Sequence, residues 1–173
     1  SLLGALPEML QTAWGALFRA LRIQAGERLL VRGGTTSVGL AATAIAKVHG
    51  LEVGSTSRHA TSEALVRQSG ASRFFLDDGA IAGLVRDAWN EGADKVLELV
   101  GTTTLPDSLA ATREPGVVCM AGMVGNRWSI ANFAPIVESS GPDNAVRRPV
   151  LEQRFLHRAR LRVRAIEDGD ITQ

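Results

Sequence analysis

The residues best placed to do chemistry form a glycine-rich turn between an apolar run and a helical pattern. Gly33 and Gly34 follow the apolar run 29–32, and small apolar residues at helical spacing begin at Ser37. A turn in this setting is expected to aim backbone N–H groups and a helix N-terminus at a pyrophosphate. The layout is that of the first strand–turn–helix unit of a dinucleotide-binding domain.

The turn departs from the G-x-G-x-x-G fingerprint at one position. The frame begins at Gly34, and Thr36 stands where the second glycine is expected. Without that glycine the backbone approaches a pyrophosphate less closely. We expect the hydroxyls of Thr35, Thr36 and Ser37 to replace the contact with side-chain donors. The alternative is an ordinary turn in a flavodoxin-like domain.

The end of the second predicted strand indicates which nucleotide is bound. An NAD site uses Asp or Glu there to accept hydrogen bonds from the ribose hydroxyls. Residues 53–59 read Val-Gly-Ser-Thr-Ser-Arg-His and contain no acid, which also argues against an S-adenosylmethionine methyltransferase. Ser57 and Arg58 suit a ribose 2′-phosphate, which a carboxylate would repel. We therefore predict NADP(H), with a solvated surface role for Arg58 as the alternative.

Glycines also follow two later strands. Val100-Gly101 ends the fourth, and Gly122-Met123 begins the turn after the fifth. Ligands of open α/β sheets lie past the carboxyl ends of the strands, so these glycines would let the backbone approach a nicotinamide ring. Each glycine taken alone is more readily an ordinary turn residue. Glu98, the polar residue of the fourth strand, is predicted to be structural, bonded to a backbone N–H.

Several other chemistries are excluded by the residues that the chain lacks. None of the three histidines has a partner at metal-ligand spacing, so we expect no metal site. The one cysteine, Cys119, allows no intrachain disulfide and reads as a buried strand residue. The chain has no tyrosine, which removes the Tyr-x-x-x-Lys pair of short-chain dehydrogenases, and no Gly-Lys-Ser/Thr of a P-loop.

The elements that position these residues alternate between strands and helices. This alternation predicts an α/β fold, a doubly wound Rossmann-type parallel sheet in the order 3-2-1-4-5 with helices on both faces. An N-terminal helix is expected over 5–21. The predicted strands are 29–32, 52–56, 73–76, 95–100 and 117–121, and the predicted helices are 37–49, 61–69, 80–89 and 105–113. After residue 137 the pattern decays, and 161–166 is left open between a sixth strand, an arm and a frayed end.

Length and charge set the wider limits. The 173 residues carry a net charge of +1, so bulk electrostatics favour neither a nucleic acid nor a membrane partner. No convincing transmembrane span or signal peptide is present, and a cytoplasmic location is expected. Seven arginines lie between Arg147 and Arg164. They raise an alternative function, a non-catalytic NADP-sensing module or a module that binds protein or RNA, although a solvated basic face is the commoner role.

Three segments together, 26–41, 93–101 and 116–122, resemble the medium-chain dehydrogenase/reductase superfamily, and within it the zinc-free, quinone-oxidoreductase-like branch. The likeness extends over about 6–137. It implies NADPH-dependent reduction of a quinone or enone, with hydride passed from the nicotinamide to the substrate. By position, Thr12 resembles the family residue on the nicotinamide side, residues 35–38 (ending at Val38) the pyrophosphate loop, and Gly122-Met123 the ring contact.

The resemblance also sets the expected domain organisation. We expect residues 1–137 to form an NADP-binding domain with its N-terminal helix, and 138–173 to be a basic tail unlike the family's last strand and returning helix. Family members carry an N-terminal GroES-like domain that forms the other wall of the cleft, and this chain begins at the linking helix. We therefore expect the chain alone to be catalytically incomplete. An open sheet edge further suggests a homodimer.

Overall fold

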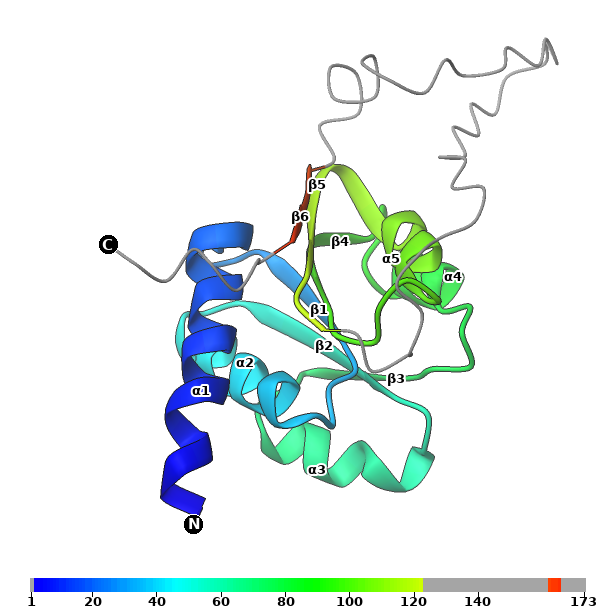
Figure 1. Cartoon of the computed structure of the whole chain (residues 1–173). Helices are drawn as coiled ribbons and strands as arrows, with labels where there is room; N and C mark the ends of the chain where they lie inside the picture. The colour runs from blue at the N-terminus through cyan, green and yellow to red at the C-terminus, as the bar shows by residue number, and fades with distance from the viewer. Residues whose placement is uncertain (1, 123–161, 166–173) are drawn as a thin grey trace, which may run out of the picture.

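The computed structural model describes residues 2–122 and 162–165, with side chains for 8–122. Six parallel strands form one sheet in the order β3-β2-β1-β4-β5-β6, with helices on both of its faces (Figure 1). The strands are β1 (Arg28–Arg32), β2 (Glu52–Ser57), β3 (Arg73–Leu76), β4 (Ala93–Glu98), β5 (Thr112–Met120) and β6 (Arg162–Ala165). The helices are α1 (Leu2–Trp14), η1 (Gly15–Leu21), α2 (Ser37–Val48), η2 (Ala60–Ser62), α3 (Glu63–Gln68), α4 (Ala82–Ala88) and α5 (Leu105–Ala110). The predicted fold class and the predicted order of the first five strands are confirmed.

The central strand β1 shows how the sheet separates two hydrophobic cores. Leu29 and Val31 point into a core shared with α1, η1 and α2, and Leu30 points into a second core with α4 and α5. Successive side chains of a strand alternate between faces, so an apolar strand of this kind must be covered on both sides. All three side chains are fully buried, and each burial is worth about 1.5–3 kcal/mol. By the same alternation, Arg32 ends β1 on the α4/α5 face.

Three predicted elements depart most from their expected boundaries in the structure. The helix expected over 5–21 is α-helical only to Trp14 and continues as the π-helix η1, which ends where Arg22 takes a left-handed conformation (φ 52°). The helix expected over 105–113 ends at Ala110, and β5 begins at Thr112 instead of residue 117. Ala93 pairs with Thr112 and Lys95 with Val117, so residues 113–116 form a bulge that local sequence signals mark as a turn.

The short strand β6 decides the question left open for residues 161–166. It pairs in parallel with β5, from Val117 opposite Arg162 to Met120 opposite Ala165. The outer edge of β5, which would be open in a five-stranded sheet, is therefore paired with β6 of the same chain. The predicted domain boundary at residue 137 lies outside the described residues and stays a prediction.

Candidate functional site

The turn after β1 is tied to the neighbouring strand β2. Gly33 has a positive φ (84°), which a side chain would strain, and its N–H donates to Oγ1 of Thr56 (3.1 Å). The N–H of Gly34 donates to the carbonyl oxygen of Thr56 (3.0 Å). A Cβ placed on Gly34 would lie 1.8 Å from Oγ of Ser55, so the glycine allows β2 to approach the turn.

These contacts correct one expectation from the sequence. The amides of Gly33 and Gly34 were predicted to face a pyrophosphate, but both are already bonded to Thr56. The physical reason is that the turn runs beside the end of β2, where its backbone N–H groups find acceptors on Thr56. Gly34 therefore contributes close packing rather than an amide donor.

Thr36 caps the helix that follows. Its hydroxyl accepts from the N–H of Gly39 (3.0 Å) and donates to the carbonyl of Gly33 (2.9 Å), so α2 begins at a properly capped end. The hydroxyl proton of Thr36 is thus used inside the turn, and the phosphate contact expected of this side chain stays a prediction. A Cβ on Gly39 would lie 2.6 Å from the carbonyl oxygen of Gly33, which shows how closely α2 packs on the turn.

The first amides of α2 are the donors best placed for an anion. The first helical bond runs from Leu40 N–H to the Thr36 carbonyl, and the N–H groups of Ser37 and Val38 lie within the helix turn that has no intrahelical carbonyl to bond. The helix dipole places partial positive charge at the same end. Thr35 and Ser37 are exposed and Val38 is half-buried. This end of α2 can therefore accept a phosphate group by the ordinary chemistry of a helix N-terminus.

The end of β2 carries the pair predicted to select the nucleotide. Ser57 is buried, and its Oγ accepts from the N–H of His59 (3.2 Å), which shapes the loop. Arg58 is exposed. Asp77 follows the neighbouring strand β3, and its N–H donates to the Ser57 carbonyl (2.8 Å). Asp77 is itself buried and bonded on both oxygens, so it is not presented to a ribose.

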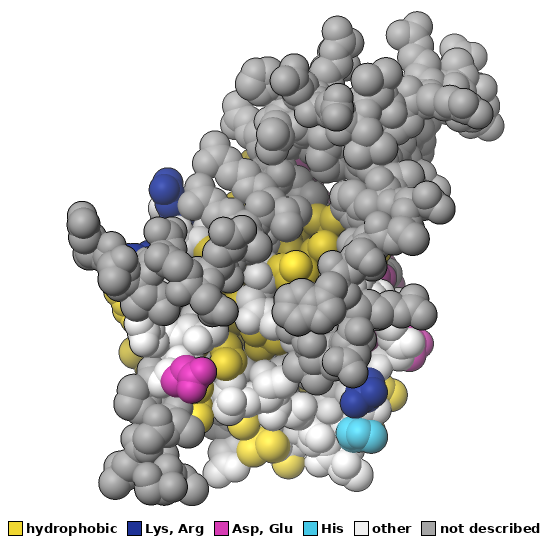
Figure 2. All heavy atoms as spheres, viewed as in Figure 1, with side chains coloured by type: hydrophobic (Ala, Val, Ile, Leu, Met, Phe, Trp, Pro, Cys, Tyr) yellow, Lys and Arg dark blue, Asp and Glu magenta, His cyan; other side chains and the backbone are white. Residues whose placement is uncertain are grey.

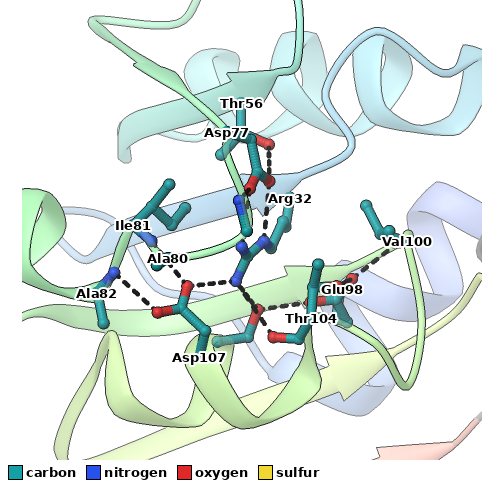
Figure 3. Close-up of polar contacts among 12 residues, drawn as sticks. Arg32, Thr56, Asp77, Ala80, Ile81, Ala82, Glu98, Val100, Thr104 and Asp107 are labelled. Carbon is teal, nitrogen blue, oxygen red and sulfur yellow. Dashed lines mark hydrogen bonds and ion pairs between the residues drawn. The ribbon is translucent and has the colours of Figure 1, made fainter.

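A buried arginine joins the ends of three elements beneath this surface (Figure 3). Arg32 is fully buried and holds Asp77 with two parallel bonds, Nε to Oδ2 (2.9 Å) and Nη2 to Oδ1 (2.8 Å). Its Nη1 donates to Oδ2 of Asp107 (2.6 Å) and to Oγ of Ser108 (3.2 Å), both on α5. Two-bond arginine–carboxylate pairs are among the strongest polar contacts in proteins.

The ionisation of this pair follows from its surroundings. Burial disfavours the charge on Arg32, but hydrogen bonds and the charges of Asp77 and Asp107 outweigh it and raise its pKa above the ordinary value. Burial likewise opposes ionisation of Asp77, yet the bonds from Arg32, Gly79 and Thr56 hold the pKa of that carboxyl below its usual range. Both groups are therefore charged at neutral pH.

The pKa of Asp77 predicts acid sensitivity of the fold. An aspartate that is more acidic when folded stabilises the protein fully above its unfolded pKa of about 3.9, and this contribution is lost as the pH falls through the folded pKa. We expect the free energy of unfolding, measured by urea titration, to fall as the pH drops below about 4. Asp77→Asn should lower stability at pH 7 and flatten that fall, while Asp78→Asn, at the exposed neighbour, is the control. Equal slopes in the wild type and Asp77→Asn would count against the ion pair.

Glu98 fixes the turn after β4, as the sequence predicts. It is fully buried at the end of that strand, and its Oε1 accepts from the N–H groups of Val100 (2.8 Å) and Gly101 (3.0 Å). The same oxygen accepts from the hydroxyl of Thr104 (3.0 Å). The half-buried Val100 is thereby held at the carboxyl edge of the sheet, next to β1.

The remaining predicted residues are placed less directly. A Cβ on Gly122 would lie 2.5 Å from the Leu99 carbonyl oxygen, so the end of β5 packs on the backbone after β4. Thr12 is half-buried on α1, and within the described part of the chain no hydrogen bond links it to the turn after β1. Met123 lies outside the described residues.

Comparison with known proteins identifies the family. The sequence profile of the family described as "Zinc-binding dehydrogenase" matches residues 37–140, more than half of the chain. The chain belongs to this family. Its relatives place it in the quinone-oxidoreductase-like branch of the medium-chain dehydrogenase/reductase superfamily.

Three of these relatives show how much is shared. Rat (Rattus norvegicus) quinone oxidoreductase is 35% identical over 117 residues, which are 66% of this chain and 36% of the rat protein. A mycobacterial protein solved with NADPH is 25% identical, with a TM-score of 0.67 over 92% of this chain and 43% of its own. A quinone oxidoreductase from Pseudomonas syringae pv. Tomato (TM-score 0.67, 19% identical, 91% and 43% covered) shares the fold. The chain thus spans about a third of the length of the rat relative.

The family description mentions zinc, but the described residues do not fit a zinc site. Nowhere in 2–122 or 162–165 do three or more His, Cys, Asp or Glu side chains gather in a way that could hold a metal ion. The acids of the Arg32 cluster are bonded to a guanidinium and to backbone amides instead. We therefore assign no chemistry to a metal in this member of the zinc-binding dehydrogenase family.

Two observations concern the surface of the described residues. Among the side chains coloured in Figure 2, basic groups on the visible face are isolated rather than gathered in a patch. Most of the arginine-rich stretch 147–164 lies outside the described residues. Of the helices that the structure describes, none combines the length and the apolar character needed to traverse a bilayer.

The buried cluster around Arg32 was not predicted from the sequence. A signal was present, because an arginine ends an otherwise apolar strand and Asp77 directly follows another strand. In a parallel sheet the carboxyl ends of strands meet at one edge, so opposite charges there can be expected to pair. Ser108 and Asp107 gave no such signal, since the helix α5 that brings them near is positioned only by the tertiary fold.

Proposed function

We propose that this chain is the NADP(H)-binding domain of an oxidoreductase of the quinone or enone reductase type. The observation that carries the proposal is the carboxyl edge of the sheet. There the first amides of α2 have no hydrogen-bond partner among the described residues, and β2 ends at Ser57, followed by Arg58. The capped helix suits a pyrophosphate, and the arginine suits a ribose 2′-phosphate. The mycobacterial relative solved with NADPH supports the same choice of nucleotide.

The absence of a free acid at the end of β2 favours NADP(H) over NAD(H). Asp77 is the only carboxylate bonded to the end of β2 among the described residues, and Arg32 and Thr56 occupy it. A ribose 2′-phosphate bound at the end of β2 would therefore contact Arg58 without repulsion from a free carboxylate on that strand. This arrangement differs from the NAD fingerprint, in which an Asp or Glu accepts from both ribose hydroxyls.

The proposed chemistry is transfer of a hydride, which a bound nicotinamide supplies. The residues of this chain would bind and orient the nucleotide: the amides of Ser37 and Val38 at the pyrophosphate, Ser57 and Arg58 at the 2′-phosphate, and the turn of Val100 at the ring side. A small quinone or enone is the proposed substrate, in line with the name of the rat relative. A cytoplasmic location and a homodimer are parts of the same proposal. Because β6 covers the edge of β5, the dimer would form through another surface, and light scattering tests it.

Calorimetric titration of the chain with NADPH and NADH tests the nucleotide assignment. We expect tighter binding of NADPH, because NADH lacks the 2′-phosphate. Arg58→Ala should weaken NADPH binding about tenfold and leave NADH binding unchanged, the size expected for one charge-assisted contact. Arg19→Ala, at another exposed arginine, is the control. Equal affinity for both nucleotides would overturn the assignment to NADP(H).

A further inference from the structure

An unbroken path of hydrogen bonds runs under the carboxyl edge of the sheet, from the turn after β1 to the turn after β4. At the first turn, the N–H of Gly33 donates to Oγ1 of Thr56, which donates to Oδ2 of Asp77 (3.2 Å). Asp77 accepts two parallel bonds from one edge of the Arg32 guanidinium, through Nε and Nη2. This half of the path ties the candidate phosphate turn to a fully buried charge.

The second half of the path leads from Arg32 to the other turn. Its Nη1 donates to Oγ of Ser108 (3.2 Å), and that hydroxyl donates to Oε2 of Glu98 (2.5 Å). The other oxygen of Glu98 accepts the amides of Val100 and Gly101. Figure 3 shows Arg32 lying between Asp77 on one side and the α5 and Glu98 contacts on the other.

The residues of this path are buried, so the loss of any one of its hydrogen bonds is costly. Arg32, Glu98 and Ser108 are fully buried, and Thr56 is 1% exposed. A buried group that loses its partner is not rescued by water, so cutting one bond leaves a donor or acceptor unsatisfied. The groups next to the cut bond must then find other partners within the buried path.

We propose that Arg32 is a positioning residue that couples the turn after β1 to the turn after β4 and so holds the two sides of the nucleotide site in fixed relation. The coupling is a property of the free protein. Its consequence for nucleotide affinity rests on the proposed function.

The chain offers well-matched variants for a test. Thr56→Val cuts the path next to Gly33 while keeping the side-chain shape. Ser108→Ala removes the direct link to Glu98 and leaves only the longer one, in which Arg32 donates to the carbonyl of Thr104 and the Thr104 hydroxyl donates to Glu98. Thr43→Val makes the same change as Thr56→Val at a buried hydroxyl on α2 that has no hydrogen-bond partner among the described residues, and it is the control. The fully buried centres of β1 and β4, at Leu30 and Val96, report global stability.

Amide hydrogen exchange of the nucleotide-free chain measures the coupling. Thr56→Val is expected to speed exchange at Val100 and Gly101 about tenfold relative to Leu30 and Val96, and Ser108→Ala to do the same at Gly33. Thr43→Val should change none of these amides. Faster exchange only at the turn beside each substitution, or equally at all amides, would overturn the coupling.

Calorimetry then separates this inference from the proposed function. If the wild type binds NADPH, both path variants should bind it about tenfold more weakly, and unchanged affinity in both would contradict the positioning role. If the wild type binds no nucleotide, the proposed function is wrong, and the exchange measurement still decides the coupling.

Discussion

Arg32→Met is expected to lower the free energy of unfolding by about 3–5 kcal/mol at pH 7. The substitution leaves Asp77 buried without its main partner and removes the ion pair to Asp107. A buried carboxylate that loses its counter-charge pays the full cost of desolvation. Urea unfolding followed by circular dichroism measures the change.

Two variants show whether this loss comes from the buried charge. Arg32→Lys should recover little, since an ammonium cannot make the two parallel bonds to Asp77. Arg73→Met removes an ion pair to Glu52 whose side chains are 42% and 39% exposed, and it should cost less than about 1 kcal/mol. A loss in Arg32→Met no larger than in Arg73→Met would show that the cluster contributes little to stability.

Gly39→Ala is expected to destabilise the protein by about 2 kcal/mol and to weaken NADPH binding strongly. The new Cβ would lie 2.6 Å from the Gly33 carbonyl oxygen and 2.9 Å from the Gly34 Cα. These are backbone atoms, so α2 must move away from the turn and carry the amides of Ser37 and Val38 with it. Thermal unfolding and calorimetric titration report the two effects.

Gly83→Ala provides the matched control, because it makes the same change inside another helix. A Cβ at Gly83 on α4 meets nothing within 4 Å. Alanine should therefore stabilise that helix by about 0.5–1 kcal/mol through its higher helix propensity. If the two variants behave alike, close packing at Gly39 is not what holds the turn.

The parts of the fold that the sequence predicts are those set by local patterns. The strand at 73–76 has the predicted bounds, and α2 begins at the predicted Ser37, because hydrophobic runs and glycine turns act over a few residues. The early start of β5 depends on Thr112 pairing with Ala93, a contact between distant segments. The change from α-helix to π-helix at Gly15 is not indicated by the spacing of apolar residues over 5–21.

The candidate site divides in the same way. The glycine turn and the lack of an acid after β2 can be predicted from the residues themselves. The sequence does not show which hydrogen-bond donors remain free, because the amides of Gly33 and Gly34 and the hydroxyl of Thr36 bond to partners that only the fold brings near. The same holds for Arg32, whose partners lie 45 and 75 residues away in sequence.

A crystal structure of the chain with NADPH would show where the nucleotide binds. We expect pyrophosphate oxygens within hydrogen-bond distance of the amides of Ser37 and Val38, and the 2′-phosphate against Arg58. A nucleotide bound elsewhere, or one whose pyrophosphate leaves both amides uncontacted, would contradict it.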